Sequence, residues 1–249
     1  MSEQDSRKER ATSFGAQASA YSAGRPGYPS RAVARLLAPD VMVVADVGAG
    51  TGKLTASLLQ PGRTIYAVEP DSAMLDTLSA QLPSVHGLIG TAEQIPLADN
   101  VCDALTFGQS WHWVDPLVAV AEAARVLRPG GTLGLIWNIR DETVPWVAQL
   151  TEIIAASEAE VFVAQGGPTL GPPFGVPRQE TFDWDRRLDI EQLLAMVNSR
   201  SQIITATESE RADILERVRQ LGAEVADSDG TIVLPYRTHV FRATLDQTG

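Results

Sequence analysis

The sequence predicts an α/β fold in which helices cover both faces of a doubly wound, mostly parallel β-sheet. Three observations support this prediction: strand and helix patterns alternate from residue 41 to residue 137, the connections between them are short, and a glycine-rich turn directly follows the first apolar strand. Alternation over short connections is typical of parallel βαβ units. With 249 residues, of which 44% are hydrophobic, the chain is long enough to enclose a substantial core.

The repeating units occupy the first half of the chain. Residues 31–37 read as a helix that Ser30 could cap, and 41–47 is an apolar, valine-rich run typical of a buried parallel strand. In 72–82 and 116–127 the apolar residues recur at helical spacing, and a Pro-Gly-Gly turn precedes the strand at 132–137. The other strands are predicted at 64–68, 87–90 and 101–107, with a further helix at 54–59.

The pattern changes after residue 138. Residues 144–163 read as helical, and the next segment, 166–177, holds four glycines and four prolines, which predicts a loop. Beyond the loop we predict a strand at 181–188, helices at 190–199 and 208–221, and a closing strand within 231–245. The C-terminal hundred residues are therefore expected to add a sheet edge and a cover rather than an independent domain.

Composition excludes several classes of function. The formal net charge is −11, and so acidic a surface repels a phosphate backbone, which makes nucleic acid a poor partner. No apolar run approaches the roughly 18 residues of a membrane span, and the charged first ten residues do not resemble a signal peptide, so we expect a cytoplasmic protein without membrane insertion. The single cysteine, Cys102, reads as a buried small hydrophobe, and His86 and His239 stand alone, so no metal site is expected.

The strongest local motif is Asp46-Val47-Gly48-Ala49-Gly50-Thr51-Gly52-Lys53, at a predicted strand-to-helix turn. A phosphate-binding Walker A loop would need glycine in place of Val47 and Ser or Thr in place of Leu54. A dinucleotide-binding fingerprint would need its third glycine where Lys53 stands, which weakens that reading without removing it. The remaining spacing is acidic-x-G-x-G-x-G, in which glycines let the backbone approach a ligand closely.

Three further motifs follow in order. Glu69 ends the second predicted strand, where a carboxylate can accept hydrogen bonds from both hydroxyls of a ribose, a feature that NAD sites share. The segment 90–97, Gly-Thr-Ala-Glu-Gln-Ile-Pro-Leu, is followed by the acidic pair Asp99 and Asp103. The run 124–131, Ala-Arg-Val-Leu-Arg-Pro-Gly-Gly, precedes the fifth strand. A single glycine triplet is weak support for cofactor binding, whereas four motifs in this order are a specific combination.

In this order the motifs resemble those of class I S-adenosylmethionine-dependent methyltransferases. The chain is similar to the small-molecule enzymes of the ubiquinone/menaquinone biosynthesis and trans-aconitate methyltransferase-like families over residues 14 to about 140. The resemblance implies a Rossmann-like, seven-stranded sheet with one antiparallel edge strand. It also implies these contacts with S-adenosylmethionine: Tyr21, Arg25, Asp46, Gly48, Ala49, Gly50, Gly52, Glu69, Pro70, Met74, Thr91, Ala92, Glu93 and Gln109. Many relatives carry Asp where Thr91 stands.

The segment 108–114 follows the fourth strand and bears on the methyl acceptor. It lacks the D/N-P-P-Y/F motif of DNA amino methyltransferases, and its Gln-Ser-x-His-Trp pattern is similar to the trans-aconitate-like group, which implies that His112 lies near the reacting centre. His112 would act as a general base or as a hydrogen-bond donor that orients the acceptor, or it would have a purely structural role. Candidate acceptor contacts are Trp111, Trp113, Arg140 and Trp146; Arg140 would bind a carboxylate or form a salt bridge with Asp141 or Glu142.

The sequence therefore predicts an enzyme that moves a methyl group from S-adenosylmethionine to a small molecule, with O-methylation of a carboxylate or hydroxyl favoured. The alternatives are an NAD-linked oxidoreductase and a protein that binds S-adenosylmethionine or S-adenosylhomocysteine without turnover. We expect a monomer or homodimer with a disordered tail at 1–13 and a single domain at 14–249. Within it, 14–140 would be the cofactor-binding core, 141–180 an insertion that covers the substrate, and 181–249 the sheet edge and C-terminal helices.

Overall fold

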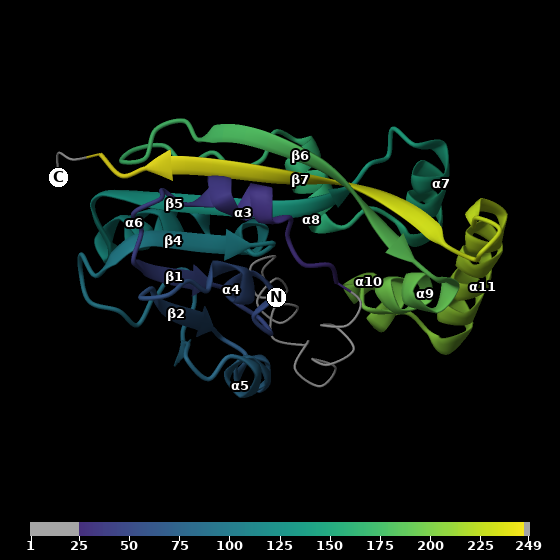
Figure 1. Ribbon diagram of the computed structural model, residues 1–249, viewed down its shortest axis with the longest axis horizontal. Coiled ribbons are helices and arrows are strands. Elements are labelled where there is room, and N and C mark those ends of the chain that lie inside the picture. The colour runs from purple at the N-terminus through teal and green to yellow at the C-terminus, as the bar shows by residue number, and fades with distance from the viewer. Residues whose placement is uncertain (1–24, 247–249) are drawn as a thin grey trace.

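A seven-stranded sheet organises the computed structural model, which describes residues 25–246 (Figure 1). The strand order is β3-β2-β1-β4-β5-β7-β6, and β7 is antiparallel to both of its neighbours while the first five strands run parallel. The strands are β1 Val43–Val47, β2 Thr64–Glu69, β3 His86–Ile89, β4 Cys102–Gly108, β5 Leu127–Arg140, β6 Arg178–Leu188 and β7 Ile232–Thr244. The predicted doubly wound fold is confirmed, and its antiparallel strand lies one place inside the edge formed by β6.

Helices cover the two faces of the sheet because the buried strands are apolar on both sides. Helices α3 (Ser30–Leu36), α4 (Lys53–Leu58) and α5 (Ser72–Gln81) bury their apolar residues in one hydrophobic cluster with Val44, Ala104 and Ile136. Helices α6 (Pro116–Val126) and α8 (Glu158–Ala164) contribute to a second cluster on the opposite face. Successive residues of a strand point to opposite faces, so Ala104 joins the first cluster and Leu105 the second.

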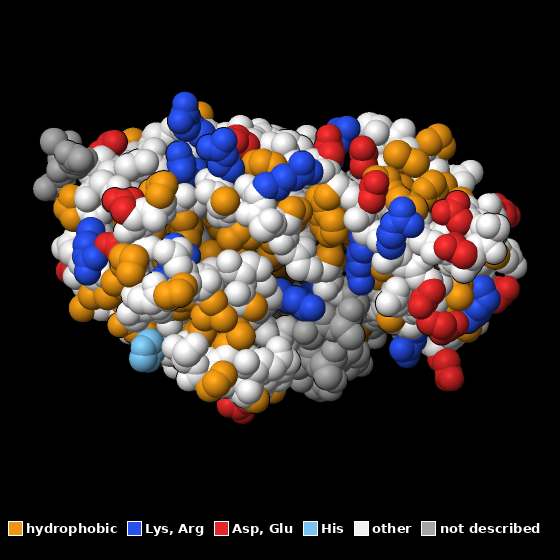
Figure 2. Space-filling model, in the orientation of Figure 1, with side chains coloured by type: hydrophobic (Ala, Val, Ile, Leu, Met, Phe, Trp, Pro, Cys, Tyr) orange, Lys and Arg blue, Asp and Glu red, His pale blue; other side chains and the backbone are white. Residues whose placement is uncertain are grey.

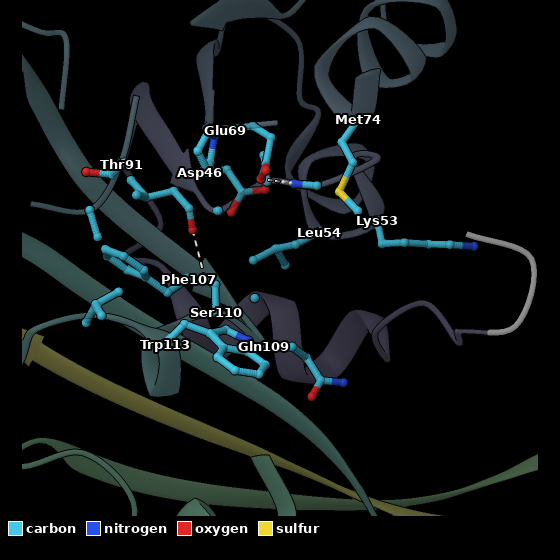
Figure 3. Close-up of a pocket in the computed structure, with 18 of the residues that line it drawn as sticks. Asp46, Lys53, Leu54, Glu69, Met74, Thr91, Phe107, Gln109, Ser110 and Trp113 are labelled. Atoms are coloured by element: carbon cyan, nitrogen blue, oxygen red, sulfur yellow. Dashed lines mark hydrogen bonds between the residues drawn. The ribbon is translucent and has the colours of Figure 1, made fainter. Parts of the chain in front are cut away.

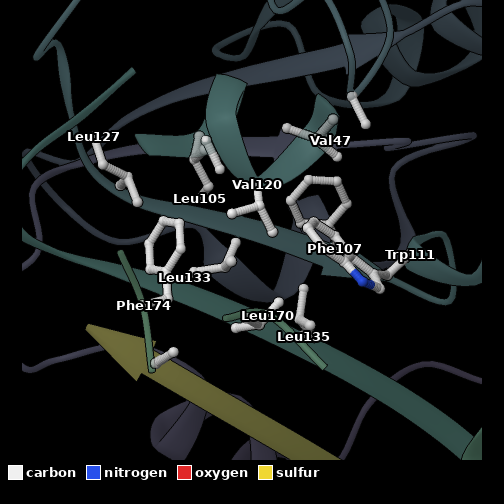
Figure 4. Close-up of a cluster of buried hydrophobic side chains, with 14 of the residues drawn as sticks. Val47, Leu105, Phe107, Trp111, Val120, Leu127, Leu133, Leu135, Leu170 and Phe174 are labelled. Atoms are coloured by element: carbon white, nitrogen blue, oxygen red, sulfur yellow. The ribbon is translucent and has the colours of Figure 1, made fainter. Parts of the chain in front are cut away.

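The second cluster contains most of the buried aromatic side chains among the described residues (Figure 4). Phe107 at the end of β4 meets Trp111 edge to face, with 4.7 Å between ring centroids, and both side chains are almost fully buried. Leu170 and Phe174 from the Gly/Pro-rich loop insert into the same cluster, so the loop is tied to the sheet by two apolar anchors. Cys102 is fully buried here and burial raises the pKa of its thiol to about 12, as expected for a structural cysteine.

A third cluster lies at the far end of the long strands β6 and β7, beyond the other strands (Figure 1). Four helices build it together with these two strand ends: α7 Pro145–Ile154, α9 Ile190–Asn198, α10 Ser201–Ile204 and α11 Glu208–Val225. Capping boxes at Asp189 and Thr207 begin α9 and α11, because each side chain accepts a backbone N–H of the first turn. No helix among residues 25–246 has the length and apolar character needed to cross a bilayer.

The helical segment predicted at 144–163 is two helices rather than one. Ala155 adopts a left-handed φ of 60°, which ends α7, and Ser157 starts α8 with a capping box to Glu160. The helical periodicity indicates both helices, and the Ser-x-x-Glu pattern from Ser157 to Glu160 marks the start of the second one. The expected tail at 1–13 lies outside the described residues.

We predict that Gly134→Ala destabilises the fold. A Cβ at Gly134, in the middle of β5, would lie 2.8 Å from both the carbonyl oxygen and a methyl carbon of Leu36 in α3. Because Leu36 is fully buried and its backbone cannot shift without disturbing the packing, the free energy of unfolding should fall by roughly 1–3 kcal/mol. Thermal and urea denaturation would measure it. Gly27→Ala, which places its methyl group in open space, is the control; equal stability of the two variants would contradict the packing argument.

Candidate active site

A cavity of about 840 Å³ lies at the carboxyl ends of β1, β2 and β4. The strand order reverses between β1 and β4, and open α/β sheets bind ligands at such a reversal. The cavity is lined by twelve of the residues predicted to contact the cofactor: Arg25, Asp46, Gly48, Ala49, Gly50, Glu69, Pro70, Met74, Thr91, Ala92, Glu93 and Gln109. Gly52 does not line it, and Tyr21 lies outside the described residues.

The glycine loop after β1 needs backbone conformations that suit glycine. Gly48 and Gly50 have φ of 68° and 56°, in the left-handed region. A Cβ on Gly48 would lie 2.6 Å from the side chain of Ser110, whose hydroxyl donates to the carbonyl oxygen of Val47 at 2.9 Å. Gly52 serves packing instead, because a Cβ there would meet Leu78 of α5 at 3.0 Å. Gly48 and Gly50 therefore shape the cavity, and Gly52 allows the start of α4 to pack closely against α5.

Glu69 lies at the end of β2 with its carboxylate beside the glycine loop (Figure 3). Its Oε2 accepts the backbone N–H of Gly50 at 2.9 Å and its Oε1 that of Asp71 at 3.1 Å. Burial raises the pKa of Glu69, and the two backbone N–H groups oppose that rise. Each carboxylate oxygen keeps a further lone pair, so the group can accept hydrogen bonds from a diol in the cavity while it holds the loop.

Asp46, at the end of β1, is 1% exposed and braces the same loop. Its two oxygens accept hydrogen bonds from Thr55 of α4 at 2.6 Å and Thr106 of β4 at 3.0 Å. Burial raises the pKa of Asp46 to about 6, against the opposing effect of the two hydroxyls and with a smaller contribution from the charge of Glu69. Asp46 therefore joins β1, α4 and β4 at the base of the cavity.

The third wall of the cavity is the loop that contains Thr91, Ala92 and Glu93. Glu93 accepts the backbone N–H of Asp115, the residue that caps α6. The guanidinium of Arg125 holds the following residues by donating to the carbonyl oxygens of residues 95 and 97 at 3.0 and 2.9 Å, and to the carboxylates of Asp99 and Glu122. The motif at 124–131 thus supports the loop from behind rather than facing the cavity.

The side chains predicted to contact the acceptor lie in different places. Trp113 lines the cavity, whereas Trp111 is buried against Phe107 and Trp146 lies in the third cluster on α7. The ring of His112 packs beside Trp113 and Phe162, and its Nδ1 accepts the indole N–H of Trp137 at 3.3 Å. His112 is not among the residues that line the cavity.

Arg140 ends β5 and is 4% exposed. It pairs with Glu160 of α8 at 2.8 Å rather than with Asp141 or Glu142, and it also donates to the hydroxyl of Thr151 at 3.0 Å. Asp141 instead pairs with Arg237.

A second cation, Arg200, contacts the other carboxylate oxygen of Glu160 at 3.0 Å. Burial alone would raise the pKa of Glu160, but the charges of Arg140 and Arg200 lower it to about 2. Two cations share one carboxylate here, and the Nη1 atom of Arg140 is buried without a hydrogen-bond partner.

Comparison with known proteins identifies the family. Residues 45–135 match the model of a methyltransferase domain. The chain is 46% identical to an uncharacterized methyltransferase of Mycobacterium tuberculosis, over 96% of this chain and 98% of that protein, and 33% identical to an uncharacterized methyltransferase-like protein of Schizosaccharomyces pombe, over 89% and 91%. The chain belongs to the class I methyltransferase family. A solved structure of a candidate type II methyltransferase from Anaeromyxobacter dehalogenans has the same fold, with 22% identity, a TM-score of 0.67 and coverage of 90% of this chain and 98% of that one.

The methyltransferase cavity also contains residues that the sequence analysis missed. Tyr28, Lys53 and Ser110 line it, as do Asp115 to Val118 at the start of α6. The start of that helix is predicted correctly at residue 116, but its place at the cavity comes from the fold, in which Asp115 donates its backbone N–H to Glu93 of the loop at 90–97. No residue between 141 and 180 lines the cavity, so the covering role expected for this insertion stays a prediction. Within residues 25–246, no three His, Cys, Asp or Glu side chains gather as a metal site.

We predict that Asp46→Asn alters the pH dependence of stability. A folded-state pKa of about 6, above the ordinary carboxyl value of 3.8, means that the native protein binds more protons than the unfolded chain between these pH values, so its stability falls as pH rises through the window. Asparagine carries no charge to bury. The stability of the variant relative to the parent should therefore improve by up to roughly 2–3 kcal/mol between pH 4 and pH 7. Urea denaturation at several pH values measures it, and a pH-independent difference would refute the prediction.

Proposed function

We propose that this methyltransferase binds S-adenosylmethionine in the cavity beside β1, β2 and β4 and transfers its methyl group to an oxygen of a small molecule, with a carboxylate favoured over a hydroxyl. The observation that carries the cofactor assignment is the convergence of the glycine loop, Glu69 and the loop at 90–97 on one cavity. The predicted positions come from separate parts of the sequence, and their shared location is what adenosine and methionine moieties require.

The residues present fit this cofactor. Glu69 offers its free lone pairs to the ribose hydroxyls, and the loop at 90–97 offers backbone groups and the side chain of Thr91 to an adenine. Arg25 lies at the cavity and is the candidate partner for the carboxylate of the methionine moiety. When bound, S-adenosylmethionine supplies a methyl group on a positively charged sulfur, ready for displacement by a nucleophile.

The remaining task of the protein is to exclude water and to orient the acceptor. Phe107, Leu54 and Trp113 give the cavity apolar wall. Displacement at a methyl group needs an electron pair in line with the bond that breaks, and an ionised carboxylate supplies one without any base. A hydroxyl acceptor would instead need a group that takes its proton.

The tautomer of His112 favours the carboxylate. An indole N–H only donates, so the Nδ1 that accepts it from Trp137 carries no proton, and the neutral ring holds its proton at Nε2. In that tautomer neither ring nitrogen can take a proton from a hydroxyl acceptor. Because the ring packs beside Trp113, which lines the cavity, we propose that His112 positions this part of the wall, and we propose an electrostatic role for the Arg140 and Arg200 pair toward an acidic acceptor.

The cofactor assignment predicts that S-adenosylhomocysteine binds saturably in calorimetric titration and that NAD does not bind. Glu69→Ala should weaken the binding at least about 10-fold, because a buried carboxylate and its hydrogen bonds to ligand and loop are lost together. Glu152→Ala, which removes an exposed carboxylate on α7, is the matched control and should leave the affinity unchanged. Binding of NAD in place of S-adenosylhomocysteine would contradict the cofactor assignment and would support the glycine loop as a dinucleotide-binding site.

The acceptor assignment predicts that a screen of small acids with labelled S-adenosylmethionine yields methyl esters, which release methanol in mild base, whereas methyl ethers do not. Arg140→Gln should raise the KM for an acidic acceptor about 10-fold or more and leave the affinity for S-adenosylhomocysteine unchanged, because it removes a charge from the acceptor side only. The control is Arg237→Gln, which removes a more exposed cation on β7, opposite Ile139 near the same end of β5. Cofactor binding without transfer to any acid or alcohol would instead support the binding protein without turnover.

A further inference from the structure

A continuous run of side-chain hydrogen bonds crosses three strands and ends on the segment that borders the cavity. The indole N–H of Trp184 on β6 donates to the hydroxyl of Thr238 on β7 at 2.8 Å. That hydroxyl donates to Oδ1 of Asn138 on β5 at 2.7 Å, and Nδ2 of Asn138 donates to the carbonyl oxygen of Gly27 at 3.0 Å. Thr238 is fully buried and Asn138 is 6% exposed.

The direction of this run is determined by chemistry. An indole N–H can only donate, so the oxygen of Thr238 accepts it and turns its own hydrogen toward Asn138. Oδ1 of Asn138 must then face Thr238, which leaves the NH₂ group to face Gly27. The orientation of the Asn138 amide is therefore imposed by Trp184, two strands away.

The register of the sheet explains why these residues meet. Asn138 lies directly opposite Thr238 in the β5–β7 pair. In the β6–β7 pair, Phe182 lies opposite Thr238, and Trp184 stands two residues further along on the same face, within diagonal reach of an aromatic side chain. Stacking of Trp184 on Tyr236, with ring centroids 5.0 Å apart, holds the indole in place.

Gly27 belongs to a stretch, residues 26–29, without helix or strand structure. Its neighbours Arg25, Pro26 and Tyr28 all line the cavity. Tyr28 reaches Gly108 at the end of β4, because a Cβ on Gly108 would lie 2.9 Å from the phenolic oxygen. The hydrogen bond from Asn138 to Gly27 thus connects the sheet to a part of the cavity wall that belongs to no helix or strand.

We propose that Asn138 and Thr238 are positioning residues for cofactor binding: they orient residues 25–28 against the cavity, although neither lines it. This inference rests on the proposed binding of S-adenosylmethionine. It assigns a part in cofactor affinity to β6 and β7, which are far in sequence from every motif of the cofactor site. It also gives a reason for a buried amide and a buried hydroxyl at these positions, since both side chains donate and accept hydrogen bonds in the run.

The test compares Thr238→Val, Asn138→Ala and the double variant with the parent protein. Thr238→Val keeps the side-chain volume and shape and removes only the hydroxyl. Two readouts are needed: the affinity for S-adenosylhomocysteine by calorimetry, and hydrogen–deuterium exchange of the backbone amides of residues 25, 27 and 28 in cofactor-free protein. Thr132→Val is the control for loss of a buried hydroxyl from the sheet. Thr132 lies on β5, well before Asn138 in the same strand.

We expect exchange at residues 25–28 to rise in Thr238→Val and Asn138→Ala, and affinity to fall about 3- to 10-fold, as for loss of one net hydrogen bond. The double variant should be no weaker than Asn138→Ala, because both changes break the same run. Unchanged exchange in Thr238→Val overturns the inference, as does unchanged affinity in both single variants, and the volume-conserving change decides if Asn138→Ala does not fold. Failure of the parent to bind S-adenosylhomocysteine would refute the cofactor assignment, and exchange alone would then decide whether the attachment exists.

Discussion

Burying a carboxylate costs free energy unless hydrogen bonds replace its water, and this chain buries two of them side by side at the ends of β1 and β2. Asp46 is satisfied by two threonine hydroxyls and Glu69 by two backbone N–H groups. The donor from Gly50 fixes the path of the glycine loop, and the donor from Thr55 fixes the start of α4. The shape of the cavity therefore depends on satisfying these two carboxylates, and the glycines are needed because the resulting backbone path suits few other residues.

Charge is distributed unevenly in this acidic protein. The net charge is −11, yet the cavity wall includes Arg25 and Lys53, and the end of β5 carries Arg140, which shares the carboxylate of Glu160 with Arg200. Figure 2 shows several blue side chains near the middle of this face, while red ones are numerous on the surface of the part that holds α9 and α11. An acidic exterior disfavours polyanions, and the cations near the site support the small acidic acceptor proposed above.

The sequence predicts positions that the fold brings to one cavity because their signals are local. The glycine loop, Glu69 and the loop at 90–97 each sit just after a strand, and parallel strands bring their carboxyl ends together without further information. The partner of Arg140 could not be predicted in the same way. Adjacent Asp141 was the plausible partner by sequence, whereas Glu160 reaches Arg140 only because α8 folds back onto β5, and nothing in the local pattern specifies that packing.

The same distinction explains where β6 and β7 enter the function. They contribute no motif, and by sequence they read only as a sheet edge and a support for the third cluster. In the fold, β7 pairs with β5 along nine consecutive residues, from Thr132 to Arg140, so the middle of β7 lies beside β5, and β5 in turn pairs with β4, whose end lines the cavity. A buried polar residue in the middle of β7, such as Thr238, is then connected to the segment at the cavity by hydrogen bonds through one side chain, that of Asn138. Residues that shape a methyltransferase site are therefore to be sought by register across the sheet as well as by motif along the chain.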